Sequence, residues 1–133
     1  MNAVFLKAHG TAEAPLPDRW LEAEGGRDRL RRTGFPRRPR MAPGDRLVSY
    51  ASVWRRIFMV SEVVGDPVQD GVSERWPWAV EIEPLLVVPV LSNAPPVEAI
   101  GVAPRSMSQQ SHIRLEPRHL EQAVEVLASV ARP

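Results

Sequence analysis

The chain has 133 residues, of which 44% are hydrophobic, and its formal net charge is +1. This length predicts one domain spanning 1–133, because a chain of this size buries roughly two-thirds of its unfolded surface. The absence of cysteine excludes disulfides, thiolate nucleophiles and cysteine-ligated metals, and it favours a cytoplasmic location over secretion. No stretch approaches the ~20 apolar residues of a membrane helix, so we expect no membrane partner.

The N-terminal segment lacks the basic start and the long apolar run of a signal peptide, and it predicts a strand at 4–8. A short helix is expected at 18–24, with Asp18 as its N-cap and with Trp20 and Leu21 packed against the sheet. A glycine pair, Gly25-Gly26, and a series of prolines mark the loops that follow, at Pro36, Pro39 and Pro43.

Further strands are indicated by β-branched runs bounded by glycine, proline and aspartate, at 46–51, 56–64, 78–86 and 111–115. A separate strand at 87–90 is left open. The 14 prolines argue against many long helices, but 117–131 has helical periodicity after a proline suited to the first turn. Its predicted apolar face consists of Leu120, Ala123, Val124, Leu127 and Val130. These elements predict an α+β fold, a mixed β-barrel with a few short helices and a C-terminal helix.

Positive charge is concentrated between residues 27 and 46. This stretch contains eight arginines and two aspartates, so its formal charge is +6 and that of the rest of the chain is −5. Such a cluster suits phosphate groups, and Arg37, Arg38 and Arg40 are candidate contacts to a nucleic-acid backbone. An ordinary solvated loop is an equally weighted interpretation. Lys7 is the only lysine in the sequence.

The sequence offers little for catalysis. His9, His112 and His119 do not have the spacing of metal ligands, and no phosphate-binding glycine loop is present. Ser111 and His112 are adjacent, so along a strand their side chains are expected on opposite faces, unable to pair as nucleophile and base. We therefore expect no catalytic residue, metal or cofactor, and a protein that is not an enzyme.

Aromatic side chains are better supplied than catalytic ones. Four tryptophans and one tyrosine provide flat faces on which a base can stack, although core packing is the commoner use of tryptophan in a small barrel. Tyr50 and Ser52 share a strand face, and Trp54 follows in or beside a turn. Together these three residues are expected to form one wall of a binding site.

The order of several short blocks resembles the EVE domain family of the PUA-like superfamily, over residues 4–120. The blocks are Val4-Phe5-Leu6-Lys7, the strand after Gly44-Asp45, Gly65-Asp66-Pro67, Arg75-Trp76-Pro77-Trp78 and Gln110-Ser111-His112. Many EVE domains carry Trp-Asp-Gly and Arg-Asn-Tyr between the first two strands. Here residues 33–39 read Thr-Gly-Phe-Pro-Arg-Arg-Pro, so part of the family's pocket is expected to be remodelled or missing.

The resemblance implies a PUA-like barrel and a non-enzymatic reader that flips a modified base of DNA, a modified cytosine or adenine, into an aromatic pocket. Flipping costs a few kcal/mol, which stacking and contacts to the base edge must offset. The residues that match the family's central and closing strands, and are expected to converge on one pocket, are Tyr50, Ser52, Trp54, Gln110, Ser111 and His112. An RNA-binding PUA-like module and a small-molecule-binding protein or enzyme on the same scaffold are the alternatives. The oligomeric state is open, with a monomer favoured.

Overall fold

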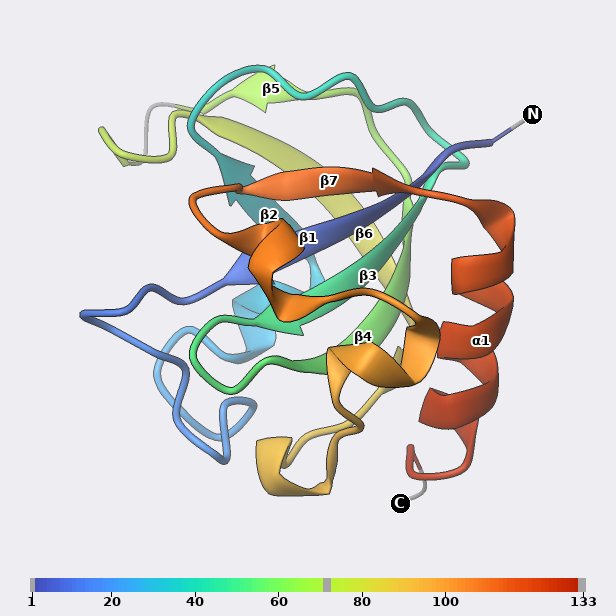
Figure 1. Ribbon diagram of the computed structural model, residues 1–133. Helices are drawn as coiled ribbons and strands as arrows, with labels where there is room; N and C mark the ends of the chain where they lie inside the picture. The colour runs from blue at the N-terminus through green and yellow to red at the C-terminus, as the bar shows by residue number, and fades with distance from the viewer. Residues whose placement is uncertain (1, 71–72, 132–133) are drawn as a thin grey trace.

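The fold is built on one curled, mixed β-sheet with an α-helix at its C-terminal end (Figure 1). The computed structural model describes residues 2–70 and 73–131. Within this described part of the chain the sheet has seven strands: β1 (Val4–His9), β2 (Arg32–Phe35), β3 (Arg46–Ala51), β4 (Arg56–Val63), β5 (Val68–Gln69), β6 (Trp78–Val87) and β7 (His112–Leu115). Their order is β2-β6-β4-β3-β1-β7, and β5 pairs with β6. The expected α+β, barrel-like class is therefore confirmed as a curled half-barrel.

Strand β1 lies at the centre of the site that is described below. It pairs in parallel with β3 and antiparallel with β7. Because side chains alternate along a strand, Phe5, Lys7 and His9 share one face and Val4 and Leu6 share the other. All five are buried, since the curled sheet encloses the first set on its concave side.

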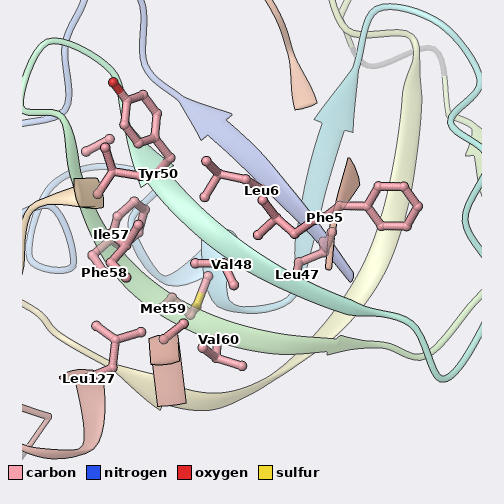
Figure 2. Close-up of a cluster of buried hydrophobic side chains, with 14 of the residues drawn as sticks. Phe5, Leu6, Leu47, Val48, Tyr50, Ile57, Phe58, Met59, Val60 and Leu127 are labelled. Carbon is pink, nitrogen blue, oxygen red and sulfur yellow. The ribbon is translucent and has the colours of Figure 1, made fainter. Parts of the chain in front are cut away.

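The core surrounds β3 and β4, the strands richest in apolar residues (Figure 2). The strand β3 is buried along nearly its whole length, as expected for a strand that has neighbours on both sides and is covered on both faces. Trp20 joins this core at 1% exposure. Its indole Nε1 donates a hydrogen bond to the carbonyl oxygen of Val88 at 2.9 Å, so its polar atom is satisfied inside the protein.

The helix α1 (Pro117–Ala128) begins with Pro117 in its first turn, as predicted. It packs on β3, β4, β6 and the 3-10 helix η3 (Val97–Ile100). The buried line runs through His119, Ala123 and Leu127. The predicted face was too wide, because Val124 is 41% exposed. The predicted helix was also too long: α1 ends at Ala128, so Val130, which is 38% exposed, lies beyond it.

The expected helix at 18–24 is wrong, because this segment forms turns. The Asp18 carboxylate accepts hydrogen bonds from the backbone N–H and the hydroxyl of Ser92, at 2.7 and 3.3 Å. A long-range contact thus replaces the expected N-cap. The region 87–90 is not a separate strand: β6 ends at Val87 and the 3-10 helix η2 (Leu91–Asn93) follows.

Two strands, β2 and β5, were not predicted. The former follows the 3-10 helix η1 (Arg27–Leu30), and another 3-10 helix, η4 (Pro104–Met107), precedes β7. Among the described helices, none combines the length and the hydropathy that crossing a bilayer requires.

Replacing Leu127 tests the docking of α1. Leu127 is fully buried, so Leu127→Ala is expected to lower the free energy of unfolding by ~2–5 kcal/mol in denaturant titrations. The matched control is Val124→Ala, one turn earlier on the exposed side, which is expected to change it by no more than ~0.5 kcal/mol. Equal effects of the two substitutions would show that the helix is not docked through Leu127.

Candidate functional site

A cavity of about 950 Å³ lies in the region where the curled sheet is left open. The strands β2 and β7 stand at the two ends of the strand order. The walls come from β2, the segment just before β7, β1, η1 and the segment before β6. The lining residues that matter for its chemistry are Lys7, His9, Arg29, Thr33, Trp76 and Ser111. Segments far apart in the sequence therefore meet at this one concavity.

The two sheet ends meet through side chains at one point. The rings of Phe35 on β2 and His112 on β7 form an edge-to-face contact, with centroids 5.1 Å apart and planes at 89°. The His112 ring also meets the Phe5 ring edge-on at 5.9 Å. Such contacts are attractive beyond their buried area, and they hold the two sheet ends near each other beside the cavity.

Lys7 is the most unusual residue of the cavity. It is 4% exposed, although lysine is almost never fully buried unless it is paired. Its Nζ lies 5.0 Å from the ring centroid of Phe35 and 5.6 Å from that of Trp76, and it donates a hydrogen bond to the Ala8 carbonyl oxygen at 2.6 Å. None of the ion pairs found among the described residues includes Lys7.

This environment changes the acidity of the amine. Burial, followed by the positive charge of Arg29, lowers the pKa of Lys7 from 10.5 to about 7. Both causes disfavour the ammonium form, because it has left water without gaining a carboxylate. The amine therefore exchanges its proton close to neutral pH.

His9 and Arg29 extend this basic region. Nη1 of Arg29 lies 3.2 Å from Nδ1 of His9, and since a guanidinium can only donate, Nδ1 accepts and the neutral ring carries its proton on Nε2. Burial, Lys7 and Arg29 together hold the pKa of His9 well below its usual 6.5. His9 is thus a neutral acceptor that orients Arg29.

Trp76 forms the aromatic wall of the cavity opposite Lys7. It packs against β2 at Gly34, where an added Cβ would lie 3.0 Å from the Cβ of Trp76. Glycine at this position therefore lets the indole lie close to the strand. The guanidinium of Arg75 lies 5.3 Å from the indole centroid, within the range of a cation–π contact.

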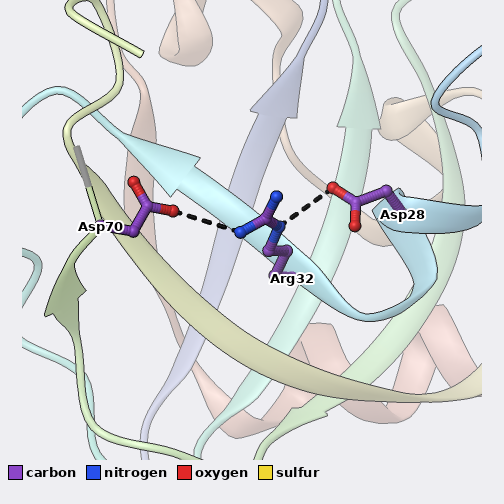
Figure 3. Close-up of polar contacts among 3 residues, drawn as sticks. All are labelled: Asp28, Arg32 and Asp70. Carbon is purple, nitrogen blue, oxygen red and sulfur yellow. Dashed lines mark hydrogen bonds and ion pairs between the residues drawn. The ribbon is translucent and has the colours of Figure 1, made fainter. Parts of the chain in front are cut away.

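The rim of the cavity is held by Arg32. Its guanidinium binds the carboxylate of Asp28 at 3.0 Å and that of Asp70 at 3.3 Å (Figure 3). These contacts join η1, β2 and the segment after β5. Because Arg32 is 44% exposed, each pair contributes little on its own, and its role is to fix the shape of the rim.

The structure brings together three of the six residues expected in the pocket. Ser52, Gln110 and Ser111 line the cavity. Tyr50 is 5% exposed and belongs to the hydrophobic core. Trp54 is half-buried, and its Nε1 donates a hydrogen bond to the Leu16 carbonyl oxygen at 2.8 Å. Neither of these two aromatic residues is among the lining residues, so the expected aromatic wall of Tyr50 and Trp54 is corrected to one that contains Trp76.

His112 also lies outside the lining, between Phe5 and Phe35. Contrary to the expectation of opposite faces, its Nδ1 is 2.9 Å from the hydroxyl oxygen of Ser111. The reason is that β7 begins at His112, so Ser111 is not held by strand alternation. Burial and the charge of Lys7 lower the pKa of His112.

The candidate backbone contacts Arg37, Arg38 and Arg40 lie in the loop after β2 and are all exposed. The buried residues Pro39 and Met41 anchor this loop, and the Arg38 guanidinium lies 5.4 Å from the Trp78 ring centroid. Two other arginines of the basic cluster form ion pairs within the protein, namely Arg32 and Arg46. The free positive charge is therefore smaller than the sequence suggests.

Comparisons with known proteins establish the fold alone. No protein-family model and no curated protein matches the chain. A hypothetical protein from Leishmania major is similar in structure, with a TM-score of 0.60 and 11% identity over 99% of this chain and 98% of that one. Proteins from Agrobacterium tumefaciens (TM-score 0.54, 15% identity, 98% and 96% coverage) and Pseudomonas putida (0.55, 15%, 93% and 99%) share the same arrangement. Such low identity carries no information on activity.

The pKa of Lys7 is directly measurable because the chain has one lysine. In protein labelled selectively at lysine with carbon-13, we expect the single Cε signal to titrate with a midpoint of about 7. Arg29→Gln is expected to raise this midpoint, since it removes a neighbouring positive charge. A midpoint near the ordinary value of 10.5 in the folded protein would contradict the burial of an unpaired amine.

Proposed function

We propose that this protein is a non-enzymatic nucleic-acid-binding domain that takes a flipped, modified base of DNA into the cavity lined by β1, β2 and the segment before β7. The observation that carries the proposal is the cavity itself. Its volume of about 950 Å³ lies within the range of small-molecule sites and leaves room for a nucleotide. Its lining combines an aromatic ring with hydrogen-bonding groups, the combination that reading a flipped base requires.

Trp76 is assigned the stacking role and Ser111 and Gln110 the polar contacts. Stacking on an aromatic side chain is sequence-tolerant, because every base has a π face. The hydroxyl and amide groups of the other two residues can donate and accept hydrogen bonds along a base edge. Gln110 and Ser111 were already expected at the site from the family resemblance. Trp76 takes the stacking role that had been expected of Tyr50 and Trp54.

The loop after β2 supports a contact to the phosphate backbone. Pro36 belongs to the cavity lining, and the exposed Arg37, Arg38 and Arg40 follow it directly. A strand whose base enters the cavity would thus pass close to these arginines. Arginine suits such contacts because its planar fork binds phosphate oxygens in pairs.

Membership of the EVE family within the PUA-like superfamily is part of this proposal. The half-barrel is compatible with it, and the segment 33–39, where the chain departs from the family pattern, supplies Thr33, Gly34 and Pro36 to the cavity. A remodelled segment at this position would change which base fits. Binding to RNA rather than DNA is one outcome of the experiments below.

The first test is the affinity of Trp76→Ala for matched oligonucleotides, DNA and RNA, with modified and plain bases. We expect at least a fivefold loss for the preferred oligonucleotide, since stacking contributes ~1–3 kcal/mol, and a smaller ratio between modified and plain bases. The control is Trp54→Phe, outside the cavity, which is expected to keep both the affinity and the ratio between modified and plain bases. Unchanged binding by folded Trp76→Ala would contradict the proposal, and preference for RNA would select the alternative reader.

The second test separates backbone contacts from base reading. Replacing Arg37, Arg38 and Arg40 by glutamine is expected to weaken binding to all sequences equally and to flatten the salt dependence by about one slope unit per lost phosphate contact. The ratio between modified and plain bases should stay the same. An unchanged salt slope would assign these arginines to an ordinary solvated loop.

A further inference from the structure

We propose that the cavity binds an oxyanion, a phosphate or a carboxylate, where Lys7 and Arg29 meet. The inference deepens the proposed function, on which it rests for the identity of the natural ligand, by stating the charge of what enters the site. The anion site itself can be tested without any oligonucleotide.

The first argument is that two basic side chains converge here, and no ion pair among the described residues includes Lys7. The nearby carboxylate of Asp28 acts on Arg29 and also binds Arg32. Lys7 is buried at 4% exposure and lines the cavity together with Arg29. The two lie close enough for Arg29 to lower the pKa of Lys7. Buried charges in proteins are normally paired, so protonating the unpaired Lys7 amine in the empty protein costs free energy. An anion bound between them would offset that cost.

The second argument comes from the other charged groups around Lys7. His9 on β1 and His112 on β7 both have pKa values that the charge of Lys7 lowers. An imidazole is either neutral or positive, so neither can balance the ammonium. The carboxylates that line the cavity are Glu13, Asp28 and Asp70. Two of these, Asp28 and Asp70, bind Arg32 on the rim, and Glu13 is an exposed loop residue.

The third argument is the choice of lysine. Every other basic side chain besides the histidines is an arginine, yet the buried position on β1 carries the one lysine. An ammonium is a compact charge that can lose its proton when buried, whereas a guanidinium stays charged. Lysine can therefore be neutral in the empty cavity and become charged when an anion arrives. Hydroxyl donors are also near, since Thr33 shares the face of β2 with Phe35, whose ring lies by Lys7.

The experiment uses four probes by titration calorimetry: cytidine, its monophosphate, cytidine with a carboxyl group on the base, and inorganic phosphate. We expect at least one anionic nucleoside to bind about tenfold to a hundredfold more tightly than cytidine, the range of a charged hydrogen bond. Tighter binding of the monophosphate assigns the oxyanion to the nucleotide phosphate. Tighter binding of the carboxylated form assigns it to the base modification.

Proton uptake is the second readout and needs no variant. At pH 8 the free amine is mostly neutral, so binding of an anion should draw close to one proton from the buffer. Calorimetry in two buffers with different ionisation enthalpies measures this number. Lys7→Met, which keeps the length of the side chain, should remove both the anion preference and the proton uptake. The control Arg118→Gln, at an exposed arginine of α1 outside the cavity lining, should keep both.

Absence of any preference for the anionic probes, or binding of them without proton uptake, would overturn the inference. So would a folded Lys7→Met variant that keeps the preference. The two proposals fail separately. Anion binding with proton uptake but no affinity for oligonucleotides would support the oxyanion site and contradict the nucleic-acid function. Oligonucleotide binding without a preference for anionic probes would support the nucleic-acid function and contradict the oxyanion site.

Discussion

The constraint on which the site depends is that the sheet curls without closing into a barrel. Its end strands, β2 and β7, approach each other through the Phe35 and His112 rings, and the cavity occupies the space beside this contact. A fully closed barrel would fill its centre with apolar side chains. Here the open side lets polar groups from four separate parts of the chain face one concavity, while β3 and β4 provide the rigid core that positions them.

The electrostatics of the site follow from this geometry. On β1, strand alternation directs Lys7 to the concave side, and the Phe35 and Trp76 rings beside it exclude water. The amine therefore has little solvation and no ion-pair partner, which is why its pKa is lowered to about 7. Arg29, in contrast, is oriented by the neutral His9 ring. When the Lys7 amine is protonated beside the guanidinium of Arg29, no ion pair found among the described residues neutralises its charge.

Much of the fold could be predicted from local pattern. The bounds of β3 were predicted at 46–51 as observed, because period-two sequence and turn residues define it. The strand β2 could not be predicted, since Arg32, Thr33 and Gly34 lack a strand pattern and are held by pairing with β6.

The binding site, too, could be predicted only in part from local pattern. Ser52, Gln110 and Ser111 were identified, but alternation cannot tell which face of a doubly buried strand holds a site, so Tyr50 was misplaced. Lys7 was visible as the only lysine, yet its burial depends on contacts with Phe35 and Trp76.

The most direct test of the account is the location of ligand contacts in the intact protein. We would titrate nitrogen-15-labelled protein with the tightest-binding oligonucleotide and record the backbone and indole N–H signals. The account predicts that the largest shifts occur at Lys7, Gly34, the Trp76 indole and Ser111, which belong to different elements but line one cavity. Signals of α1 should stay unchanged. Shifts confined to the loop at 37–44, with the cavity residues unaffected, would contradict the claim that this cavity is the binding site.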